Sequence, residues 1–570
     1  MANNALITRL LEEAMLQFDP VEKLPRSPKT GNHIVVHAAT YALNMFWFGY
    51  EPGYDIARRV LNRICDLQDI RPGRTFGLWA WELEQCLDYD SWFFPDYNCT
   101  DFLCKQLTIL CKKCGHMLPE DLKQRIFTAL RNAAQCTIQR NVGSDYTNIA
   151  VMSSLFLVTA GELLQDDYIF SIGKERLDKL CRYTDTCGGF SEYNSSCYTL
   201  VVVQDTARML GMFEDPACLQ MAEKLNYYAW KLLADHFNNS ILQLSPPQAR
   251  AYVEVDKSEA DPASVCATVW VGTCGRFGTE PTKYSLELLQ FPPHCPEELI
   301  PMFEKKTYFL AETYFHPNNI RRPGEDVTII REYDCPALTA YTYRTPTYSM
   351  GAFQLCDTWA QRRTCSVVWD REQPKVFRLR GIHDGHDFAS GMSYVRQRNN
   401  LLLGHLGLVT DRGSVHYIID SNKTGIFNAS ALHFRFELFG NTDGLQIRQD
   451  GKDFWIYDGD FRIRLHIAAW KFNGKDAPIF VSEDGTAVIL QGYQGESTEL
   501  NTPRMDDTYA VFTMEVLEGT DPVCAAEPKT NFSENKLFTQ WQDLEVSSHR
   551  IPVPYRRALG LPLDAPVYTG

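Results

Sequence analysis

The sequence has no long apolar run, no basic leader and fewer basic than acidic residues. No stretch approaches the about 18 uncharged apolar residues of a membrane span, so we expect no transmembrane helix and no membrane partner. Residues 1–20 lack a basic segment followed by an apolar one, so we expect no secretory signal and a cytoplasmic protein. The formal charge of −15 excludes nucleic acid as an expected partner, because an acidic surface repels phosphate backbones.

Several cofactor-binding and nucleophile motifs are also missing. The chain contains no glycine-rich phosphate loop and no Gly-x-Ser-x-Gly elbow. Its 18 cysteines are scattered, and Cys111 with Cys114 forms a lone Cys-x-x-Cys that lacks a second pair at zinc-site spacing. We therefore expect reduced, buried thiols, no metal and no other cofactor.

The first part of the chain has the periodicity of helices. The composition, 45% hydrophobic and 22% charged residues in 570, is that of a folded protein with large cores. Before about residue 250 apolar residues recur at helical spacing, and short breaks contain Gly, Pro or Asp. Short connections make neighbouring helices antiparallel, and no fixed-period repeat favours a solenoid, so we expect an (α/α) toroid. The predicted helices are 4–17, 33–48, 54–69, 78–88, 101–115, 119–139, 148–164, 168–185, 198–213 and 215–237.

After about residue 260 the apolar period becomes two. Short strands separated by turn signals, without intervening helices, are typical of a large antiparallel β-sandwich. We therefore predict an all-α toroid at 1–255, a β-sandwich at 256–545 and a proline-rich tail at 546–570. The predicted strands are 328–330, 337–343, 366–369, 375–379, 415–419, 432–438, 461–467 and 508–516.

The segment 188–199, between two predicted helices, is the richest in chemical groups. It places Glu192, Tyr193, Asn194 and Tyr198 within seven residues. A helix N-terminus on a rigid scaffold is a suitable place for such side chains to face a cleft. A capped turn, with Ser195 or Ser196 as the cap, is the alternative interpretation.

This segment resembles two motifs of the (α/α)-toroid polysaccharide lyases. It is similar to the E-x-S-P-x-Y segment of heparinase II/III-like lyases and to the G-x-F-x-Q-H-x-x-x-x-Y segment of chondroitin and hyaluronate lyases. The resemblance implies that Tyr198 is the general acid of a β-elimination, and also implies a base, Tyr198 or Tyr193. Tyr193 stands where the second family has its catalytic His, and Ser196 where the first has Pro.

Two earlier segments add candidate substrate-binding residues. The resemblance implies that Asn148, at the start of a predicted helix, hydrogen-bonds a uronate carboxylate; an ordinary helix cap is the alternative. The aromatic segment 91–101 suits a carbohydrate cleft, because aromatic faces stack on sugars and Asp or Asn bind hydroxyls, although packing between helix layers explains it equally well. Its candidate residues are Trp92, Asp96, Asn98 and Asp101.

Further candidates follow the predicted toroid. Arg250, with Tyr252 beside it, lies at the domain junction, where it either binds a carboxylate or forms an interdomain ion pair. Arg344 and Tyr348 flank a predicted strand end and are candidate substrate contacts.

The segment 381–387 contains two histidines and two aspartates. Three interpretations of His383 and His386 remain open: metal ligands, a catalytic His near the cleft as in heparinase-like lyases, or an ordinary polar turn.

Three function classes follow from these residues. The first is a polysaccharide or oligosaccharide lyase that acts on a uronic-acid-containing glycan. The second is a glycoside hydrolase that pairs Glu192 with Asp96, Asp101 or Asp205 as its two carboxylates. The third is a non-catalytic glycan-binding protein. In each case the partner is a glycan, and a homo-oligomer is compatible with the sequence.

Overall fold

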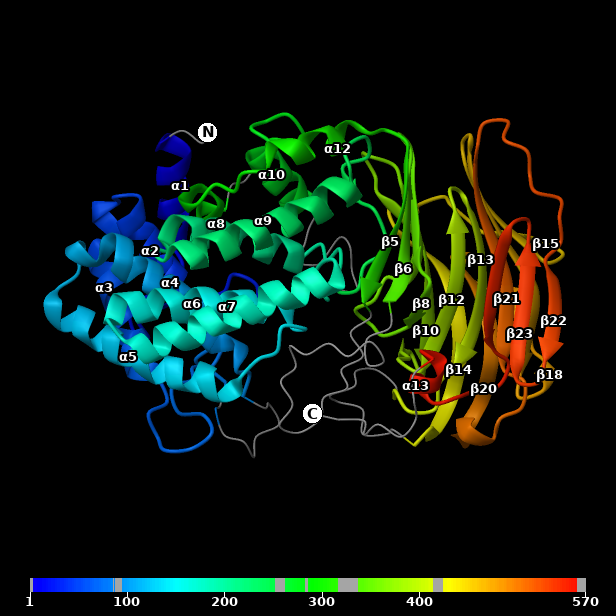
Figure 1. The fold of residues 1–570 in the computed structure, drawn as a ribbon, viewed down its shortest axis with the longest axis horizontal. Helices are drawn as coiled ribbons and strands as arrows, with labels where there is room; N and C mark the ends of the chain where they lie inside the picture. The colour runs from blue at the N-terminus through cyan, green and yellow to red at the C-terminus, as the bar shows by residue number, and fades with distance from the viewer. Residues whose placement is uncertain are drawn as a thin grey trace.

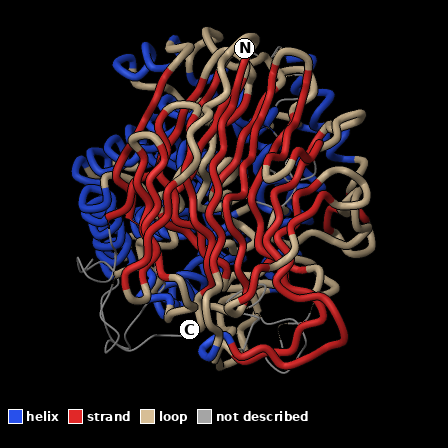
Figure 2. Tube along the Cα trace, turned by 90° about the vertical axis from the view of Figure 1, so that its right-hand side faces the viewer, coloured by secondary structure: helices blue, strands red, loops and turns tan. Residues whose placement is uncertain are grey.

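The computed structural model describes residues 4–85, 87, 95–251, 262–281, 285–315, 337–413 and 424–560. Helices form the first part of the described chain and antiparallel strands the second, which confirms the predicted fold class. The helices occupy one end of an elongated molecule and the strands the other (Figure 1). Seen from the strand end, the strands run side by side in front of the helices (Figure 2).

The helical part is an incomplete toroid of two layers. The inner row is α2, α4, α6 and α8, each in contact with the next, and each is followed by an antiparallel outer helix: α3, α5, α7 or α9. The bounds are α1 (Asn4–Met15), α2 (Ala38–Trp47), α3 (Tyr54–Leu67), α4 (Asn98–Cys114), α5 (Glu120–Arg140), α6 (Thr147–Leu164), α7 (Asp167–Cys187), α8 (Tyr198–Met212), α9 (Pro216–His236), α10 (Pro262–Gly272), α11 (Leu286–Gln290) and α12 (Ile300–Glu304).

Local signals explain where the central helices begin and end. Asp166 and Asp215 cap α7 and α9 by accepting hydrogen bonds from the backbone N–H groups of Ile169 and Cys218. Gly188 ends α7 in the left-handed conformation, with φ of 71°. Helix α6 is apolar on every side because it is an inner helix. It is the single described helix long and apolar enough to cross a membrane, and 89% of it is buried within the protein.

The strands form two large sheets and a small one. Within the described residues the first sheet has the order β19-β20-β14-β10-β9-β7-β6-β5, with β11 paired to β10. The second has the order β15-β16-β17-β21-β13-β12-β8, with β18 paired to β17, and β22-β23-β24 form the third. The pairs are antiparallel, and an apolar core fills the space between the two large sheets.

The strand bounds are β5 (Tyr308–Phe315), β6 (Ala337–Arg344), β7 (Tyr348–Phe353), β8 (Leu355–Asp357), β9 (Cys365–Trp369), β10 (Lys375–His383), β11 (His386–Asp387), β12 (Gly391–Arg398), β13 (Leu401–Leu408), β14 (Ile426–Gly440), β15 (Arg448–Asp450), β16 (Asp453–Asp458), β17 (Phe461–Phe472), β18 (Lys475–Asp476), β19 (Ile479–Val481), β20 (Ala487–Asn501), β21 (Tyr509–Glu518), β22 (Lys529–Ser533), β23 (Lys536–Trp541) and β24 (Leu544–His549). The helical part also contains two short hairpins, β1 (Phe18–Asp19) with β2 (Leu24–Pro25) and β3 (Phe237–Asn238) with β4 (Gln243–Leu244).

Several sequence predictions differ from the structure, including the start of the predicted helix 33–48, because α2 begins at Ala38. The predicted helix 78–88 is wrong for residues 78–85, because this segment instead pairs with 33–36, with Ile34 bridged to Glu82. Helices continue past the predicted boundary at 255, as far as Glu304. Residues 546–560 contain the end of β24 and helix α13 (Tyr555–Ala558), whose Tyr555 is 3% exposed. The predicted strands 328–330 and 415–419 lie outside the described residues.

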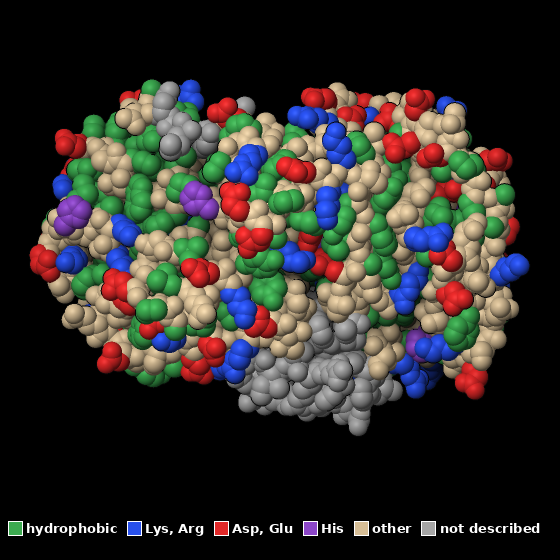
Figure 3. Space-filling view, turned by 45° about the horizontal axis from the view of Figure 1, so that its top comes forward, with side chains coloured by type: hydrophobic (Ala, Val, Ile, Leu, Met, Phe, Trp, Pro, Cys, Tyr) green, Lys and Arg blue, Asp and Glu red, His purple; other side chains and the backbone are tan. Residues whose placement is uncertain are grey.

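The 16 cysteines of the described residues form no disulfide with one another, and most are buried. Cys111 and Cys114, each 5% exposed, belong to the apolar core of the toroid. On the face shown in Figure 3, acidic and basic side chains are interspersed.

The segment 245–251 connects the helical part to the strands and is held from both sides. From the helical side, Asn194 Nδ2 donates to the carbonyl oxygens of Ser245 and Pro247, each at 2.7 Å. On the strand side, the backbone of Ala251 donates to the carbonyl of Gln361 at 2.7 Å. These bonds fix the backbone on both sides of Arg250.

Candidate active site

Glu192 and Asn148 form the buried centre of the candidate site. Glu192 lies in the loop between α7 and α8, and Asn148 lies in the first turn of α6. The Asn148 backbone N–H donates to Glu192 Oε2 at 2.8 Å, and Asn148 Nδ2 donates to both carboxylate oxygens at 3.0 and 2.8 Å. The exposed fractions of Glu192 and Asn148 are 4% and 2%, so the pair is shielded from bulk water.

Arg250 joins this pair to Tyr198 and to the strand part. Its Nη1 lies 3.0 Å from Glu192 Oε1, and its Nη2 donates to the Tyr198 hydroxyl oxygen at 3.3 Å. Its Nε donates to Gln361 Oε1 at 2.8 Å, from the loop between β8 and β9. The guanidinium therefore makes one contact with the α7–α8 loop, one with the first residue of α8 and one with the strand part.

Three aromatic rings surround the Arg250 guanidinium. Its central carbon lies 4.9 Å from the ring centre of Tyr198, 5.3 Å from that of Trp359 and 5.8 Å from that of Tyr146. These distances are within the range of cation–π attraction. The rings fix the plane and position of the cation, while Tyr198 itself is half-buried and keeps part of its surface accessible.

Burial dominates the electrostatics of the cluster. It raises the pKa of Glu192, and this shift is opposed by the positive charge of Arg250 and the hydrogen bonds from Asn148. Burial also raises the pKa of Tyr146, with a further contribution from the negative charge of Glu192. A guanidinium that donates to a phenolic oxygen stabilises negative charge on that oxygen, and Tyr198 receives such a bond.

Among the candidates of the segment 91–101, Asn98 is connected to this cluster through Tyr146. Its Nδ2 donates to the Tyr146 hydroxyl oxygen at 3.2 Å, and its Oδ1 accepts from Arg140 at 2.6 Å. Asp101 is 1% exposed and lies beside the same Arg140, and burial raises its pKa to about 6. Asp96 accepts hydrogen bonds from the Trp81 indole and the Asn98 backbone. Trp92 lies outside the described residues, as does Tyr252.

Tyr193 points away from Glu192, into the interface with β5. Its hydroxyl hydrogen-bonds His236 Nε2 at 2.9 Å and donates to Glu312 Oε1. The side chain is 3% exposed, and burial raises the pKa of Tyr193 well above its ordinary value. This environment does not suit the predicted role of Tyr193 as a base. Asn194, 1% exposed, holds the segment around Arg250 through its bonds to Ser245 and Pro247.

Arg344 and Tyr348 are buried structural residues. Arg344, 1% exposed, donates to the carbonyl oxygens of Phe237 and Met302, so it joins β6 to the helices rather than facing a ligand. Tyr348, 2% exposed, belongs to the apolar core between the sheets. The prediction that they contact substrate does not agree with these positions.

The two histidines of the segment 381–387 flank a turn between β10 and β11. His383 Nε2 lies 2.9 Å from the Asn428 carbonyl oxygen, and its ring packs against Phe388 and Phe427. His386 is exposed and pairs with His383 across the hairpin. In the described part of the chain no three His, Cys, Asp or Glu side chains are grouped as metal ligands. The polar-turn interpretation fits these contacts best.

The structure adds Tyr146, Trp359 and Gln361 to the candidate site. Tyr146 stands in the same short segment as Asn148, so an aromatic residue next to a candidate amide was an available signal. Trp359 and Gln361 come from a loop of the strand part, and Gln361 is 111 residues from its partner Arg250. Nothing in their local sequence distinguishes them from other loop residues.

Fold and site together define a two-layer helical toroid joined to antiparallel sheets, with a Tyr–Arg–Glu–Asn cluster where the two parts meet. Residues 25–286 match the family model described as a domain of unknown function, DUF8769. No curated protein matches the chain.

Two solved structures are similar in fold. Heparinase III shares 10% identity, with 90% of this chain and 82% of that chain covered and a TM-score of 0.44. The chondroitin AC lyase of Streptomyces coelicolor A3, in complex with chondroitin sulphate, shares 10% identity, with 96% and 85% covered and a TM-score of 0.46. Because these likenesses are distant, the function is inferred below from the residues of the site.

Proposed function

We propose that the protein is a lyase that cleaves a uronic-acid-containing polysaccharide or oligosaccharide by β-elimination, with Tyr198 as acid and base. The observation that supports this most directly is the hydrogen bond from Arg250 to the Tyr198 hydroxyl, beside a buried Glu192–Asn148 pair. The reaction removes the C5 proton of the uronate and expels the oxygen at C4. It therefore needs a base, an acid and neutralisation of the uronate carboxylate.

The position of Tyr198 supports its proposed role in proton transfer. It is the first residue of α8 and is half-buried, so its hydroxyl is held by the scaffold. The guanidinium of Arg250 stabilises the phenolate that takes the C5 proton. The same oxygen then returns a proton to the leaving C4 oxygen, after which the C4–O bond is broken and the C4–C5 double bond is formed. The base role goes to Tyr198 because the Tyr193 hydroxyl is engaged by His236 and Glu312.

Arg250, Asn148 and Glu192 are suited to the uronate carboxylate. A second carboxylate beside Glu192 is strongly disfavoured while Glu192 is ionised, because like charges at close range repel. Burial raises the pKa of Glu192, which favours its neutral form. A neutral Glu192 releases Arg250 and the amide of Asn148 to bind the substrate carboxylate and stabilise the charge that develops after proton removal.

The hydrolase alternative lacks a suitable second carboxylate among its candidates. Asp205 is fully buried and paired with Lys105 and Arg208. Asp101 is buried beside Arg140, and Asp96 accepts from Trp81 and the Asn98 backbone. Each carboxylate thus has a structural partner of its own.

The deciding experiment measures the product. Uronate-containing oligosaccharides, such as those from chondroitin, heparin and polygalacturonate, are incubated with the full chain, and ultraviolet absorbance of the unsaturated uronate is followed. We expect absorbance to rise with at least one of them and to stay flat with Tyr198→Phe. Cleavage that yields reducing ends without this absorbance would support the hydrolase, and binding without cleavage of any glycan would support the binding protein.

A further inference from the structure

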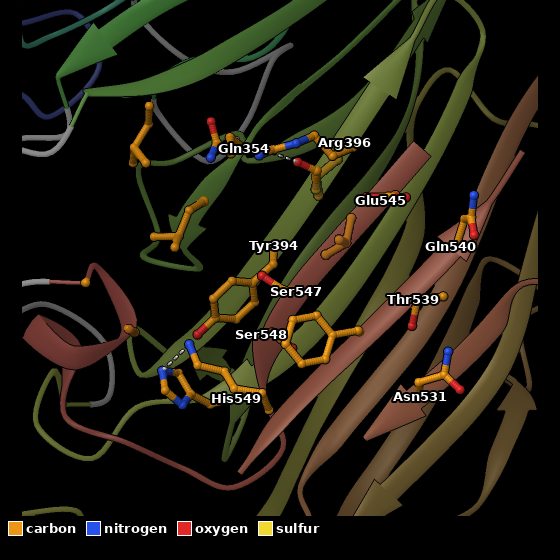
Figure 4. Close-up of a pocket in the computed structure, with 18 of the residues that line it drawn as sticks. Gln354, Tyr394, Arg396, Asn531, Thr539, Gln540, Glu545, Ser547, Ser548 and His549 are labelled. Atoms are coloured by element: carbon orange, nitrogen blue, oxygen red, sulfur yellow. Dashed lines mark hydrogen bonds between the residues drawn. The ribbon is translucent and has the colours of Figure 1, made fainter. Parts of the chain in front are cut away.

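The strand part contains a cavity of about 700 Å³, lined by strands of all three sheets and by the end of α13. On one side lie Tyr394 and Arg396 of β12; on the other lie residues of β22, β23 and β24 (Figure 4). None of the residues of the Tyr198 cluster lines it. Ligand pockets commonly have volumes of about 300–1,000 Å³, so the cavity has the size of a ligand site.

The cavity is more positive than the rest of the protein. Its wall carries the cations Arg396, Lys529 and Lys536 but a single carboxylate, Glu545. No ion pair joins any of these three cations to a carboxylate in the described part of the chain. A concentration of unpaired cations in a chain of formal charge −15 favours an anionic ligand.

Two polar groups of β12 have unmet hydrogen-bonding capacity in this wall. Tyr394 is 6% exposed, and its hydroxyl has no hydrogen-bond partner among the described residues. Arg396 is half-buried, and its one hydrogen bond to a described residue is a long contact of 3.5 Å to the adjacent carbonyl of Val395. Buried polar groups normally find partners, so both groups are available to a ligand.

The remaining wall is suited to sugar rings. Asn531 and Gln540 offer amide groups, which both donate to and accept from hydroxyls. Phe538 is 44% exposed and presents an aromatic face on the same wall. His549 accepts a hydrogen bond from Lys536 at 3.3 Å; burial and the neighbouring lysine lower the pKa of His549 to about 4, so the ring is neutral near neutral pH.

We propose that this cavity binds a segment of an acidic saccharide, one that carries carboxylate or sulfate groups, at a second site apart from the Tyr198 cluster. The cations pair with the acidic groups, Tyr394 and the amides bind hydroxyls, and Phe538 packs on a ring face. The choice of a saccharide over another anion rests in part on the proposed function. Such a site holds a long chain near the enzyme and has no part in bond cleavage.

Binding is tested on the full chain with Tyr198→Phe, which prevents turnover. Hexasaccharides of chondroitin sulfate, heparin and polygalacturonate are titrated by calorimetry, with maltohexaose as the neutral probe and inorganic sulfate as the simple anion. We expect at least one acidic hexasaccharide to bind and maltohexaose not to bind. Adding either Arg396→Gln or Lys536→Gln to the Tyr198→Phe chain should weaken that binding about tenfold, because each substitution removes a charge-assisted contact.

A matched control is Lys475→Gln, which also removes an exposed cation of the strand part but does not line the cavity. The affinity of the control variant for the acidic hexasaccharide should equal that of the Tyr198→Phe parent. Equal affinity of the Arg396 and Lys536 variants with the parent would overturn the proposal, as would the absence of binding by all acidic probes. Displacement of the saccharide by inorganic sulfate at equal concentration would overturn the saccharide assignment.

The failures of the two proposals can be told apart. Adding Arg250→Gln to the Tyr198→Phe chain alters the catalytic cluster and leaves the cavity intact, so binding at the cavity should persist. If all binding disappears with Arg250→Gln, the cavity proposal is wrong and the proposed function stands. If unsaturated product is never formed but the cavity variants still weaken binding, the proposed function is wrong and the cavity proposal stands.

Discussion

The Nη2 atom of Arg250 donates to the Tyr198 hydroxyl oxygen at 3.3 Å, and the same guanidinium lies 4.9 Å from the centre of the Tyr198 ring. Arg250 thus contacts both the oxygen and the face of one aromatic residue. The contact holds positive charge beside the group proposed to move protons. Its consequences can be measured in single variants.

Tyr198→Phe removes the proposed acid and base while keeping the ring under Arg250. Because general acid–base catalysis typically contributes about 10²–10⁴-fold, we expect a loss of product formation of at least that order. The melting temperature should change little, since Tyr198 is half-buried. Full activity of this variant would show that another group transfers the protons.

Tyr193→Phe is the matched control for the same chemical change. It removes a hydroxyl that is bonded to His236 and Glu312 at the interface with β5. We expect the free energy of unfolding to fall by about 1–3 kcal/mol, because buried partners lose a hydrogen bond, while kcat stays near that of the parent. Chemical denaturation gives the first quantity and ultraviolet assays the second. A large fall in kcat without loss of stability would restore Tyr193 as the base.

Glu192→Gln keeps a neutral hydrogen-bonding group at the centre of the cluster. Burial raises the pKa of Glu192, so its neutral form is lost as the pH rises through this raised pKa. We expect the parent's activity to fall with rising pH through that range and the variant to lack this decline. The variant should retain activity within about tenfold of the parent, the effect of one or two altered hydrogen bonds. If turnover vanished while glycan binding remained, the hydrolase assignment would gain.

Gln361→Ala removes the contact from the strand part that orients Arg250. The Nε bond to Gln361 Oε1 is 2.8 Å long, and losing a hydrogen bond to a charged group reduces activity by about tenfold or more. Gln361→Glu keeps an acceptor at the same place, so it should restore much of the loss. Measuring kcat and KM separately distinguishes a misplaced Arg250 from a general loss of folding. If Gln361→Ala were as active as the parent, a positioning role for Gln361 would be excluded.

Acid stability should depend on Glu312. Burial acts to raise the pKa of this carboxyl, but the hydrogen bond from His236 and the charges of His236 and Lys231 lower it to about 2, from an ordinary 4.5. Its contribution, about 3 kcal/mol, is therefore present above pH 4.5 and is lost as the pH falls toward 2. Denaturation across this range should show a steeper decline for the parent than for Glu312→Gln. If the stability of the parent and that of Glu312→Gln declined in parallel with falling pH, the contribution assigned to Glu312 would be contradicted.

The sequence allowed the helices and many of the strands to be predicted, because most of them bury apolar residues at a regular period or in a continuous run. The predicted helix is wrong at 78–85 because Glu82 and Glu84 bind Asn32 and His33 and hold this segment against 33–36. Periodicity alone contains no information on such pairing. Arg250 and Asn148 were found by motif and position, and the structure brings both to Glu192.

Side-chain direction was the main quantity that the sequence could not provide. Glu192 and Tyr193 are neighbours in one loop, yet the first faces Asn148 and the second faces β5. The two residues lie in a bend and turn between α7 and α8, so a cluster that is compact in sequence is divided in space. The contribution of Gln361 was hidden for another reason: its partner is set by how the strand part packs on the toroid.

The segment 245–251 makes the proposed catalytic cluster depend on the completion of folding. Arg250 contacts Glu192 and Tyr198 of the helical part and Gln361 and Trp359 of the strand part. A chain whose sheets have not yet formed has the tyrosine and the carboxylate but no fixed cation between them. Under the proposed function, activity therefore requires assembly of the whole molecule, and a nascent or partly unfolded chain would not cleave the proposed glycan substrate.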